Sequence, residues 1–531
     1  MEPEAADLPV ANERSSADPS PFFVEGTDEE SDGATENQAA VGIPLSDAYE
    51  RAAEHIANFR ATREGIVRAT PCYEVLRGFG RIFRFRSSEY YRKSFSADKI
   101  QEFWSHSWHG STTRKISTMM VQKNGFAAIC LGSLASLLLA GLFVAGYLPG
   151  YERAPFLKLG RTSYLFSVWG VLGGTLTAVM TLFCWQRRTL VFVDVICINQ
   201  ADPSLKAEAL LSMGAFLQSS ESLHVFWDET FVQRLWCIFE VGAYLGSCKL
   251  SNSGRAKRLV IRPTMLGTSS TTAFLGSFLL ALSFLASPFD DLLLGWVIFS
   301  MLCIVCCHFA VRSLRSYFAA VESMLIQLRK FRVQDAQCHC CTVGHTEESF
   351  AACDREVISL CIRKWFGSES AFERLVSTDV SSALASALGD ASFSYLWLLM
   401  VSAPISWGHM DQVAARLHAQ DMEAAAATAI IDLTYYFLAF PLVGRLGIIL
   451  ACKARRQRHQ IWANELMTCA VYFAVFPVGT VLLAMQTLLM RVMNPLTAAG
   501  LFAAINLILL VTLLRQCSHM SLLSQDVQEK S

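Results

Sequence analysis

The chain has 531 residues, of which 53% are hydrophobic and 17% are charged, and its net charge is −1. This composition is too apolar for an ordinary soluble protein, and the charge balance as a whole suggests no nucleic-acid partner. The 17 cysteines are scattered, several lie within apolar runs and no signal peptide precedes them, which argues against a secreted disulfide framework. We therefore expect a membrane protein with reduced thiols.

The first segment, residues 1–44, is rich in Glu, Asp, Ala, Ser and Pro and carries Arg14 as its single base. Such a segment cannot bury a core, so we predict a disordered acidic tail. Residues 45–125 hold a basic, aromatic lead-in and the first elements of a domain. The bases of the lead-in either attract anionic lipid head groups or form a solvated face on a short helix and hairpin. They include Arg60, Arg63, Arg68, Arg77, Arg81, Arg84, Arg86, Arg92 and Lys93.

Eight apolar segments approach the roughly 20 residues that a helix needs to cross a bilayer. They cover residues 126–148, 164–185, 271–287, 292–311, 393–407, 424–449, 466–490 and 496–514. We predict a transmembrane hairpin in 126–185, a second hairpin in 271–311 and a four-span membrane domain in 392–515. The count is approximate because the fifth segment is short and the sixth contains Asp432, Pro441 and Arg445.

The distribution of Lys and Arg predicts the orientation of these spans. Bases cluster before the first span, after the second, before the third and between the sixth and seventh, whereas most intervening loops hold acids such as Asp290, Asp291, Asp411 and Asp421. The loop 149–162, with Arg153, Lys158 and Arg161, is an exception. We expect both termini, including the tail 516–531, on the cytoplasmic side, in a membrane that the sequence does not identify.

The polar segments around the first hairpin alternate strand and helix patterns. Short apolar runs predict strands at 102–106, 190–194, 223–227 and 257–261, and helical spacing predicts helices at 112–122, 204–218 and 233–245. This alternation is typical of a doubly wound parallel sheet with its ligand crevice at the carboxyl ends of the strands. Because residues 126–185 intervene, the α/β domain, completed by residues 186–265, is predicted to be split by a membrane hairpin.

Three segments of this domain resemble a known superfamily. Phe103-Trp-Ser-His-Ser-Trp-His-Gly110 is similar to the opening strand and turn of heterokaryon-incompatibility (HET) domains, and Val193-Asp-Val-Ile-Cys-Ile-Asn-Gln200 to their most recognisable signature. Gln233-Arg-Leu-Trp-Cys-Ile-Phe-Glu240 resembles both the HET segment and the Trp-Cys-x-x-Glu helix of plant TIR domains. The resemblance covers about a quarter of the chain and implies a TIR-like sheet. The spans resemble only uncharacterised multi-pass proteins of unicellular eukaryotes.

The resemblance implies a function for Glu240, because TIR enzymes use the corresponding carboxylate to cleave nicotinamide from NAD. The glycosidic bond breaks through an oxocarbenium-like state that a carboxylate stabilises. Trp236 lies one helical turn earlier on the same face and either borders the crevice or anchors the helix in the core. The alternative for Glu240 is a structural hydrogen bond to a neighbouring turn, since fold alone does not establish catalysis.

Further ligand-binding candidates lie at the ends of the first two strands. Ser105 and His106 end the first strand, and Asp194 ends the second, followed by Asn199 and Gln200 in the loop. Asp194 either faces the ligand or caps the next turn with its side chain. His106 and His109 have the spacing of a metal pair but no acid or thiol beside them in sequence, so we expect structural roles for both.

Residues 312–391 form a predicted cytoplasmic helical segment that is rich in cysteine. Amphipathic patterns at 313–331 and 350–366 suggest a helical lid on the sheet. Thiols and an imidazole are the ligands that zinc prefers, so the segment is a candidate zinc site, although the spacing is unusual and cytosolic cysteines in a helical segment are commonly just small apolar residues. The candidate ligands are Cys338, Cys340, Cys341 and His345, with Cys353 and Cys361 nearby.

Ionisable residues within apolar spans indicate a functional role by default. Asp432, Arg445 and Arg491 are such residues, with Glu465 nearer an interface. Three hypotheses remain open: a membrane-tethered TIR/HET-like signalling protein that cleaves NAD or self-associates, a non-enzymatic interaction module, and a transporter or channel with a regulatory cytoplasmic domain.

Overall fold

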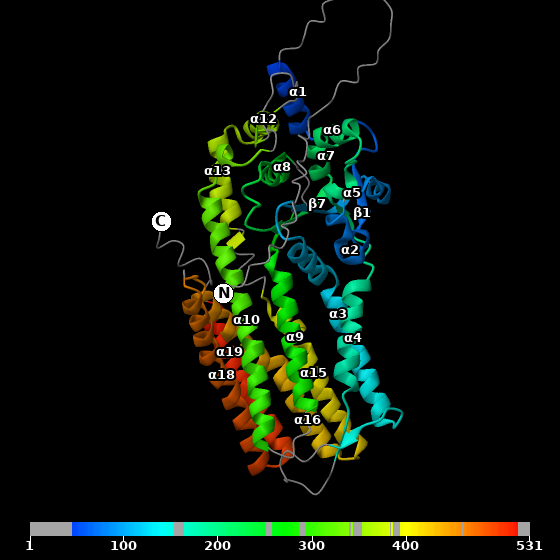
Figure 1. Cartoon of the computed structure of the whole chain (residues 1–531), viewed down its shortest axis with the longest axis vertical. Helices are drawn as coiled ribbons and strands as arrows, with labels where there is room; N and C mark the ends of the chain where they lie inside the picture. Colours follow the sequence, from blue (N-terminus) through cyan, green and yellow to red (C-terminus); the bar gives the residue numbers. More distant parts are fainter. Residues whose placement is uncertain are drawn as a thin grey trace, which may run out of the picture.

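The computed structural model describes residues 45–518 apart from 86, 153–163, 251–257, 287–291, 339–340, 343–352, 383, 386–392 and 459. The predicted acidic tail and most of the predicted tail 516–531 lie outside the described residues. The molecule is elongated, with an α/β domain at one end and a bundle of long helices at the other (Figure 1).

The α/β domain is built on a six-stranded sheet with the strand order β2-β1-β6-β3-β7-β8. The strands are β1 (Arg68–Pro71), β2 (Phe95–Ser96), β3 (Ile100–His106), β6 (Leu190–Phe192), β7 (Ser220–Trp227) and β8 (Arg258–Pro263). β6, β3, β7 and β8 are parallel, and each overlaps one of the four predicted strands. β1 pairs antiparallel with both β6 and β2 and extends the sheet at one edge. The first parallel strand along the chain is thus an inner strand, as in doubly wound sheets.

Helices cover both faces of this sheet. On one face, Phe103 of β3 stacks on Phe192 of β6 at 4.3 Å, and Phe192 packs against Phe216 of α7 at 4.7 Å between ring centroids. On the other face, Trp104 lies beneath the ammonium group of Lys123 from α3. Neighbouring residues of a strand point to opposite faces, so these two contacts place α7 and α3 on opposite sides of β3.

The remaining elements of this part of the chain pack around the sheet. α1 and α12 lie against each other, and α12 also packs on α8. The helices are α1 (Leu45–Ala57), α2 (Cys72–Gly80), α5 (Asp194–Cys197), α6 (Pro203–Leu211), α7 (Met213–Gln218), α8 (Leu235–Leu250), α12 (Asp354–Phe366) and α13 (Glu369–Leu375). Short 3-10 or π turns are η1 (Arg81–Phe83), η2 (Ser88–Lys93), η3 (Val333–Asp335) and η4 (Val376–Val380).

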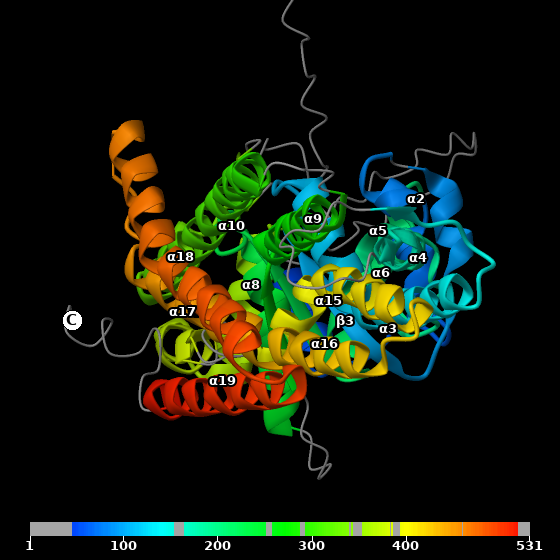
Figure 2. The same ribbon diagram turned by 90° about the horizontal axis from the view of Figure 1, so that it is seen from below.

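The other end of the molecule is a helical bundle. Its elements are α3 (Thr112–Val144), α4 (Trp169–Cys184), α9 (Met265–Ala286), α10 (Leu292–Arg329), α15 (Tyr395–His418), α16 (Met422–Thr434), the π-helix η5 (Tyr435–Ala439), α17 (Phe440–Lys453), α18 (Ile461–Val492) and α19 (Pro495–Ser518), with a short ribbon of β4 (Tyr151–Glu152) and β5 (Leu165–Phe166). α15 packs against α3, α4, α9 and α16, whereas α18 and α19 pack against each other at the side of the bundle (Figure 2).

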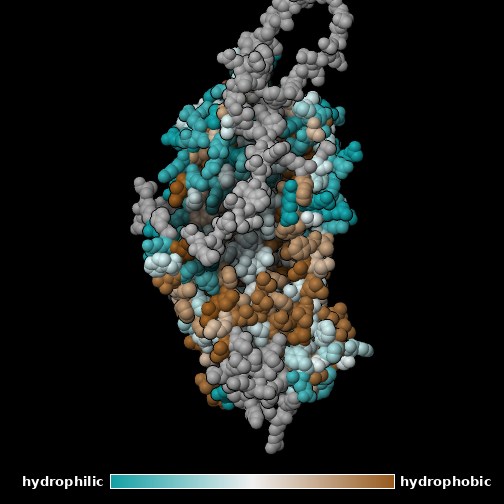
Figure 3. Space-filling view, in the orientation of Figure 1, coloured by the Kyte–Doolittle hydropathy of each residue, from teal (hydrophilic) through white to brown (hydrophobic). Residues whose placement is uncertain are grey.

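The bundle carries an apolar belt over the visible face, and the α/β domain is largely hydrophilic (Figure 3). Six helical segments are long and apolar enough to cross a membrane: α3, α9, α10, the continuous α16–η5–α17, α18 and α19. The predicted integral, multi-pass character is therefore confirmed. Eight spans stay a prediction, because α4 has only 16 residues and α15, with Pro404 and Asp411, does not meet the same criterion.

The α/β domain and the bundle are joined by continuous helices. The predicted helix 112–122 and the predicted span 126–148 are one helix, α3, of 33 residues. The buried Lys123 ammonium forms an ion pair with Glu102 of β3, and the next residue, Asn124, donates to the carbonyl of Leu182 in α4 at 2.9 Å. These contacts fix the helical hairpin α3–α4 directly to the sheet.

Candidate functional site

The candidate site lies where β3 and β6 end. These strands are neighbours, and the helices that follow them leave on opposite faces of the sheet, α3 on one and α7 on the other. In doubly wound sheets, a crevice opens at this switch point beside the carboxyl ends of the strands. The residues at these two ends are Ser105 and His106 of β3 and Asp194, the first residue of α5.

Ser105 and Glu240 form the first pair of this site. The buried hydroxyl of Ser105 donates a hydrogen bond to Glu240 Oε2 at 2.5 Å, which joins β3 to α8. Burial raises the pKa of Glu240 to about 8, even though the hydrogen bond from Ser105 and the positive charge of Arg234 act in the opposite direction; the negative charge of Asp194 adds to the rise. Near neutral pH the carboxyl group is therefore mostly protonated.

Asp194 forms a second group with His106 and Trp108. Its Oδ2 accepts a hydrogen bond from Trp108 Nε1 at 2.8 Å, and its Oδ1 lies 3.3 Å from His106 Nε2. Burial acts to raise the pKa of Asp194, but His106 and Trp108 outweigh it and hold the pKa below its usual value. Asp194 Oδ1 also accepts from the amide of Val195 at 2.8 Å, so the carboxylate additionally makes the local bond of a turn cap.

Two of the predicted loop residues shape the loop itself. Asn199 Oδ1 accepts hydrogen bonds from the amides of Ala201 and Asp202, at 3.0 and 3.2 Å, which is an Asx turn. Gln200 Nε2 donates to the carbonyl of Asp194 at 3.1 Å. The structure therefore uses both side chains within the loop between α5 and α6.

Trp236 contacts helix α12. Its indole Nε1 donates to Asp354 Oδ2 of α12 at 3.1 Å, and its ring packs edge-to-face on Phe239 at 5.2 Å. The indole therefore fixes α8 to α12, which agrees with the anchoring alternative. α12 packs on α8, the helix that also carries Glu240.

Several residues of the site were not singled out from the sequence. Trp108 contacts Asp194, Phe83 packs edge-to-face on His106 at 5.1 Å, and Arg234 approaches His109 Nδ1 at 2.5 Å. Trp108 and Arg234 both lie within the HET- and TIR-like motifs, at residues 103–110 and 233–240. Their position in these motifs could have identified them as candidates. Phe83 lies in the basic lead-in, where no pattern indicated a site.

The predicted zinc site falls only partly within the described residues. Cys340 and His345 lie outside them, Cys338 is buried, and Cys341 Sγ is 3.7 Å from Cys353 Sγ. Among the residues that the structure describes, no cluster of three or more His, Cys, Asp or Glu side chains is arranged to hold a metal ion. Zinc binding by this segment stays a prediction.

A second polar cluster lies within the bundle. Asp432 of α16 is 5% exposed, accepts from Ser406 of α15 at 3.3 Å and has its Oδ1 3.6 Å from His409 Nδ1. The ring of His409 stacks on Tyr435, the first residue of the π-helix η5, whose hydroxyl donates to Gln486 at 2.7 Å. Single-turn π-helices often occur at functional sites.

No protein-family model, curated protein or solved structure matches this chain. The TIR/HET-like resemblance therefore rests on the three motifs quoted from the sequence.

Proposed function

We propose that the chain is a membrane-tethered signalling protein whose TIR/HET-like domain cleaves NAD at the bond between nicotinamide and ribose, with Glu240 as the catalytic carboxylate. One observation carries the proposal: Glu240, with its raised pKa, is hydrogen-bonded to Ser105 at the carboxyl end of an inner parallel strand. Perturbed carboxyl groups in this position are typical of functional sites.

The chemistry suits such a carboxyl group. Cleavage transfers the bonding electrons to the nicotinamide, which leaves neutral, while positive charge develops on the ribose. An ionised Glu240 stabilises that charge until water adds its hydroxide to the ribose carbon and releases its proton to solvent. The positively charged nicotinamide ring of NAD favours ionisation of Glu240 when it binds, and the hydroxyl of Ser105 orients the carboxylate.

The test is nicotinamide release from NAD by the purified full-length protein. Glu240→Gln keeps the shape but cannot ionise, and we expect the rate to fall by roughly 100-fold or more, the loss typical for electrostatic groups. Glu229→Gln, which changes an exposed carboxylate near the same edge, is the matched control and should leave the rate unchanged. Equal rates in wild type and Glu240→Gln would exclude the catalytic role.

The pH dependence provides an independent check. Since the ionised form of Glu240 is required and its pKa in the free domain is about 8, kcat/KM should rise with pH and level off above about 8. A rate that is constant from pH 6 to 9 would contradict this assignment. If wild type releases no nicotinamide but forms crosslinked oligomers that depend on the α/β domain, the domain is an interaction module.

The cluster around Asp432 favours a second candidate function, the movement of a proton or cation through the bundle. Asp432 is a buried acid between membrane helices, beside His409 and a π-helix. Flux into liposomes that is lost in Asp432→Asn, with no NAD consumption, would favour this function over the first.

A further inference from the structure

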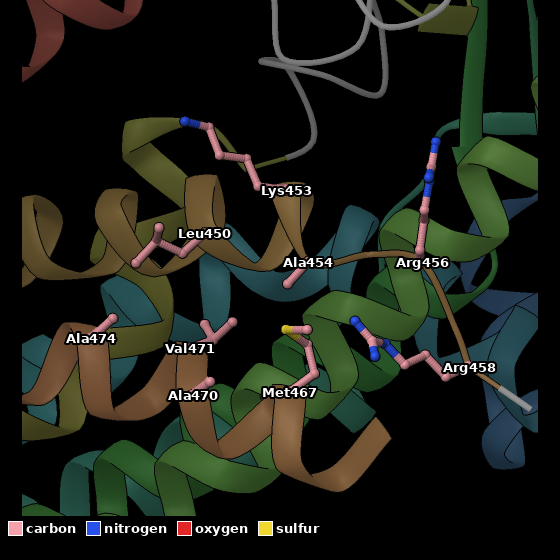
Figure 4. A pocket seen from close by; sticks show the side chains of 9 residues that line it. All are labelled: Leu450, Lys453, Ala454, Arg456, Arg458, Met467, Ala470, Val471 and Ala474. Carbon is pink, nitrogen blue, oxygen red and sulfur yellow. The ribbon is translucent and has the colours of Figure 1, made fainter. Parts of the chain in front are cut away.

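A hollow of about 410 Å³ lies between the end of α17 and the start of α18 (Figure 4). Its apolar lining includes Leu450 from α17 and Met467 and Val471 from α18. Its basic lining comes from Lys453, Arg456 and Arg458, at and just after the end of α17. The hollow thus combines an apolar surface with three cations.

The three basic side chains are available to a ligand. Lys453, Arg456 and Arg458 are exposed, and none of them forms an ion pair with another residue in the part of the chain that the structure describes. No Asp or Glu lines the hollow. In Figure 4, the guanidinium group of Arg458 is turned towards Met467, between the apolar and basic parts of the lining.

Hydrogen bonds from α10 hold the backbone of the loop between α17 and α18 in place. Arg315 of α10 is 5% exposed and donates to the carbonyl of Ala454 at 2.8 Å and to the carbonyl of Asn464 at 2.7 Å. Asn464 in turn exchanges two side-chain hydrogen bonds of 2.8 Å with the backbone of Arg458. The cations therefore extend from a preorganised loop, which lowers the cost of binding.

The position of the hollow points to its ligand. The loop after α17 lies at the end of the bundle that faces the α/β domain, where the apolar belt meets the hydrophilic part of the molecule (Figures 1 and 3). Leu466 and Phe473 on α18 are more than 60% exposed, as expected for side chains that face lipid tails. A ligand here has one end in the apolar belt and the other in water.

We propose that this hollow binds one anionic phospholipid. The phosphate and the negative head group lie against Lys453, Arg456 and Arg458, and an acyl chain packs on Leu450, Met467 and Val471. A soluble anion would leave the apolar lining unused, and a zwitterionic lipid would leave the cations without a net negative partner. The occupant that matches both parts of the lining is an anionic lipid of the bilayer.

The test measures lipid binding to the full-length protein in neutral detergent, by native mass spectrometry and by thermal stabilisation. The probes are phosphatidylserine, phosphatidylcholine and the water-soluble head group glycerophosphoserine. We expect wild type to retain phosphatidylserine at least tenfold more strongly than phosphatidylcholine. Glycerophosphoserine should bind much more weakly, because it lacks the acyl chains.

Two kinds of variant separate the basic and apolar contributions. The triple variant K453Q/R456Q/R458Q should lose at least tenfold in phosphatidylserine binding. The control K99Q/R114Q/R188Q removes three exposed cations elsewhere and should bind as wild type. Ala470→Trp fills the hollow without changing any charge and should also weaken binding.

The result that overturns the proposal is equal retention of phosphatidylserine by the triple variant and its control. Retention of phosphatidylcholine as strong as that of phosphatidylserine would contradict the role of the cations. Binding of glycerophosphoserine as tight as that of the lipid would show a site for a soluble anion instead. A variant that elutes as wild type in size-exclusion chromatography is folded, so loss of binding reports on the hollow.

Discussion

Two carboxyl groups at one edge of the sheet have opposite protonation states. The pKa of Glu240 is raised to about 8 because burial outweighs its hydrogen bond from Ser105. Asp194 is also partly buried, but His106 and Trp108 keep its pKa low. Environments that separate the pKa values of two nearby acids are typical of acid-base sites. Asp194 therefore supplies a fixed negative charge, whereas Glu240 can change its charge near neutral pH.

The raised pKa of Glu240 predicts a pH-dependent stability. In the unfolded chain Glu240 ionises near pH 4.5, while in the folded protein it stays protonated up to about pH 8. The folded state thus binds one more proton between these values, and its free energy of unfolding decreases as the pH rises through that window. Glu240→Gln removes this contribution.

Thermal unfolding of the purified protein between pH 5 and 9 measures the effect. Wild type should lose stability relative to Glu240→Gln as the pH rises, and the difference should level off above pH 8. The reference variant Glu229→Gln should follow wild type throughout. A constant difference between wild type and Glu240→Gln across this range would show that Glu240 ionises normally in the folded state.

The motifs predicted part of the site at the residue scale. Ser105, His106 and Asp194 are brought together because strand ends in a parallel sheet meet at one edge, and Glu240 of α8 joins them through its hydrogen bond with Ser105. The contact of Trp236 could not be predicted from the sequence, because its hydrogen-bond partner Asp354 is 118 residues away. Helical spacing indicates which face of a helix a side chain lies on, but not which other helix packs against that face.

At the scale of elements, the start of α4 depends on a residue from another helix. α4 has no side-chain cap of its own, and Asp411 of α15 accepts hydrogen bonds from the amides of Gly170 and Val171, at 3.0 and 2.9 Å, and from Ser167 Oγ at 2.6 Å. Asp411 is fully buried. A carboxylate at a helix N-terminus satisfies free amides and interacts favourably with the helix dipole.

Removing this cap should destabilise the bundle, and the loss should be larger the more of the hydrogen bonds to Asp411 are removed. Asp411→Ala leaves the three buried donors unpaired at a cost of roughly 1–3 kcal/mol for each donor. Asp411→Asn keeps one oxygen and should lose less. Thermal unfolding in detergent should give melting temperatures that decrease from wild type to Asp411→Asn and again to Asp411→Ala. Equal stability of Asp411→Ala and wild type would show that other groups or water satisfy these donors.

The contact between α3 and α4 requires small residues. A Cβ at Gly132 would lie 2.7 Å from the carbonyl oxygen of Gly174 and 2.9 Å from the ring of Trp407. Small residues allow membrane helices to approach closely. Gly132→Val should therefore destabilise the protein by about 1–3 kcal/mol or more, the cost of overpacking.

Gly141 provides the control on the same helix, because no atom lies within 4 Å of a Cβ at this position. Gly141→Val should unfold at the same temperature as wild type or slightly higher. Measuring both variants together separates packing from the general effect of valine in a helix. Similar losses in both variants would contradict a specific contact at Gly132.

The hydrophobic pattern of the sequence predicted the presence of helices and strands better than the residues at which they begin and end. The four parallel strands were visible as short apolar runs, whereas β1 and β2 were anticipated only as an unplaced hairpin in the basic lead-in, because four and two residues carry no periodicity. The fifth predicted span ended at residue 407, but α15 continues to His418 because Asp411 and its partners are buried in the bundle. Polar residues that pair inside a bundle interrupt an apolar run without ending the helix.

At the scale of the whole molecule, the sheet constrains the number of membrane crossings. β3 pairs directly with β6, although α3 and α4 lie between them in the chain. If α3 crosses the membrane, α4 must cross it back, even though its 16 residues extend only about 24 Å. Likewise, Arg455 after α17 pairs with Glu322 of α10 at 3.3 Å, which places the end of α17 beside the domain-facing part of α10.

These contacts predict eight crossings instead of the six that length and apolarity alone indicate. α15 must then cross in one direction so that α16–η5–α17 can return, and α18 and α19 form a last pair. Both termini should lie on the side of the α/β domain, as the distribution of Lys and Arg also predicts. Short helices can cross a bilayer that thins locally around them.

Epitope tags at residue 1, after residue 531 and in the loop 153–163 test this arrangement in sealed membrane vesicles. Protease should either cleave both terminal tags or leave both intact. The tag in 153–163 should show the opposite behaviour. A tag in 287–291 should behave as the loop tag does. If the loop 153–163 shared the side of the termini, α3 and α4 would not cross, and the α/β domain would rest on the membrane through α9 and α10 instead of being anchored from within its own sheet.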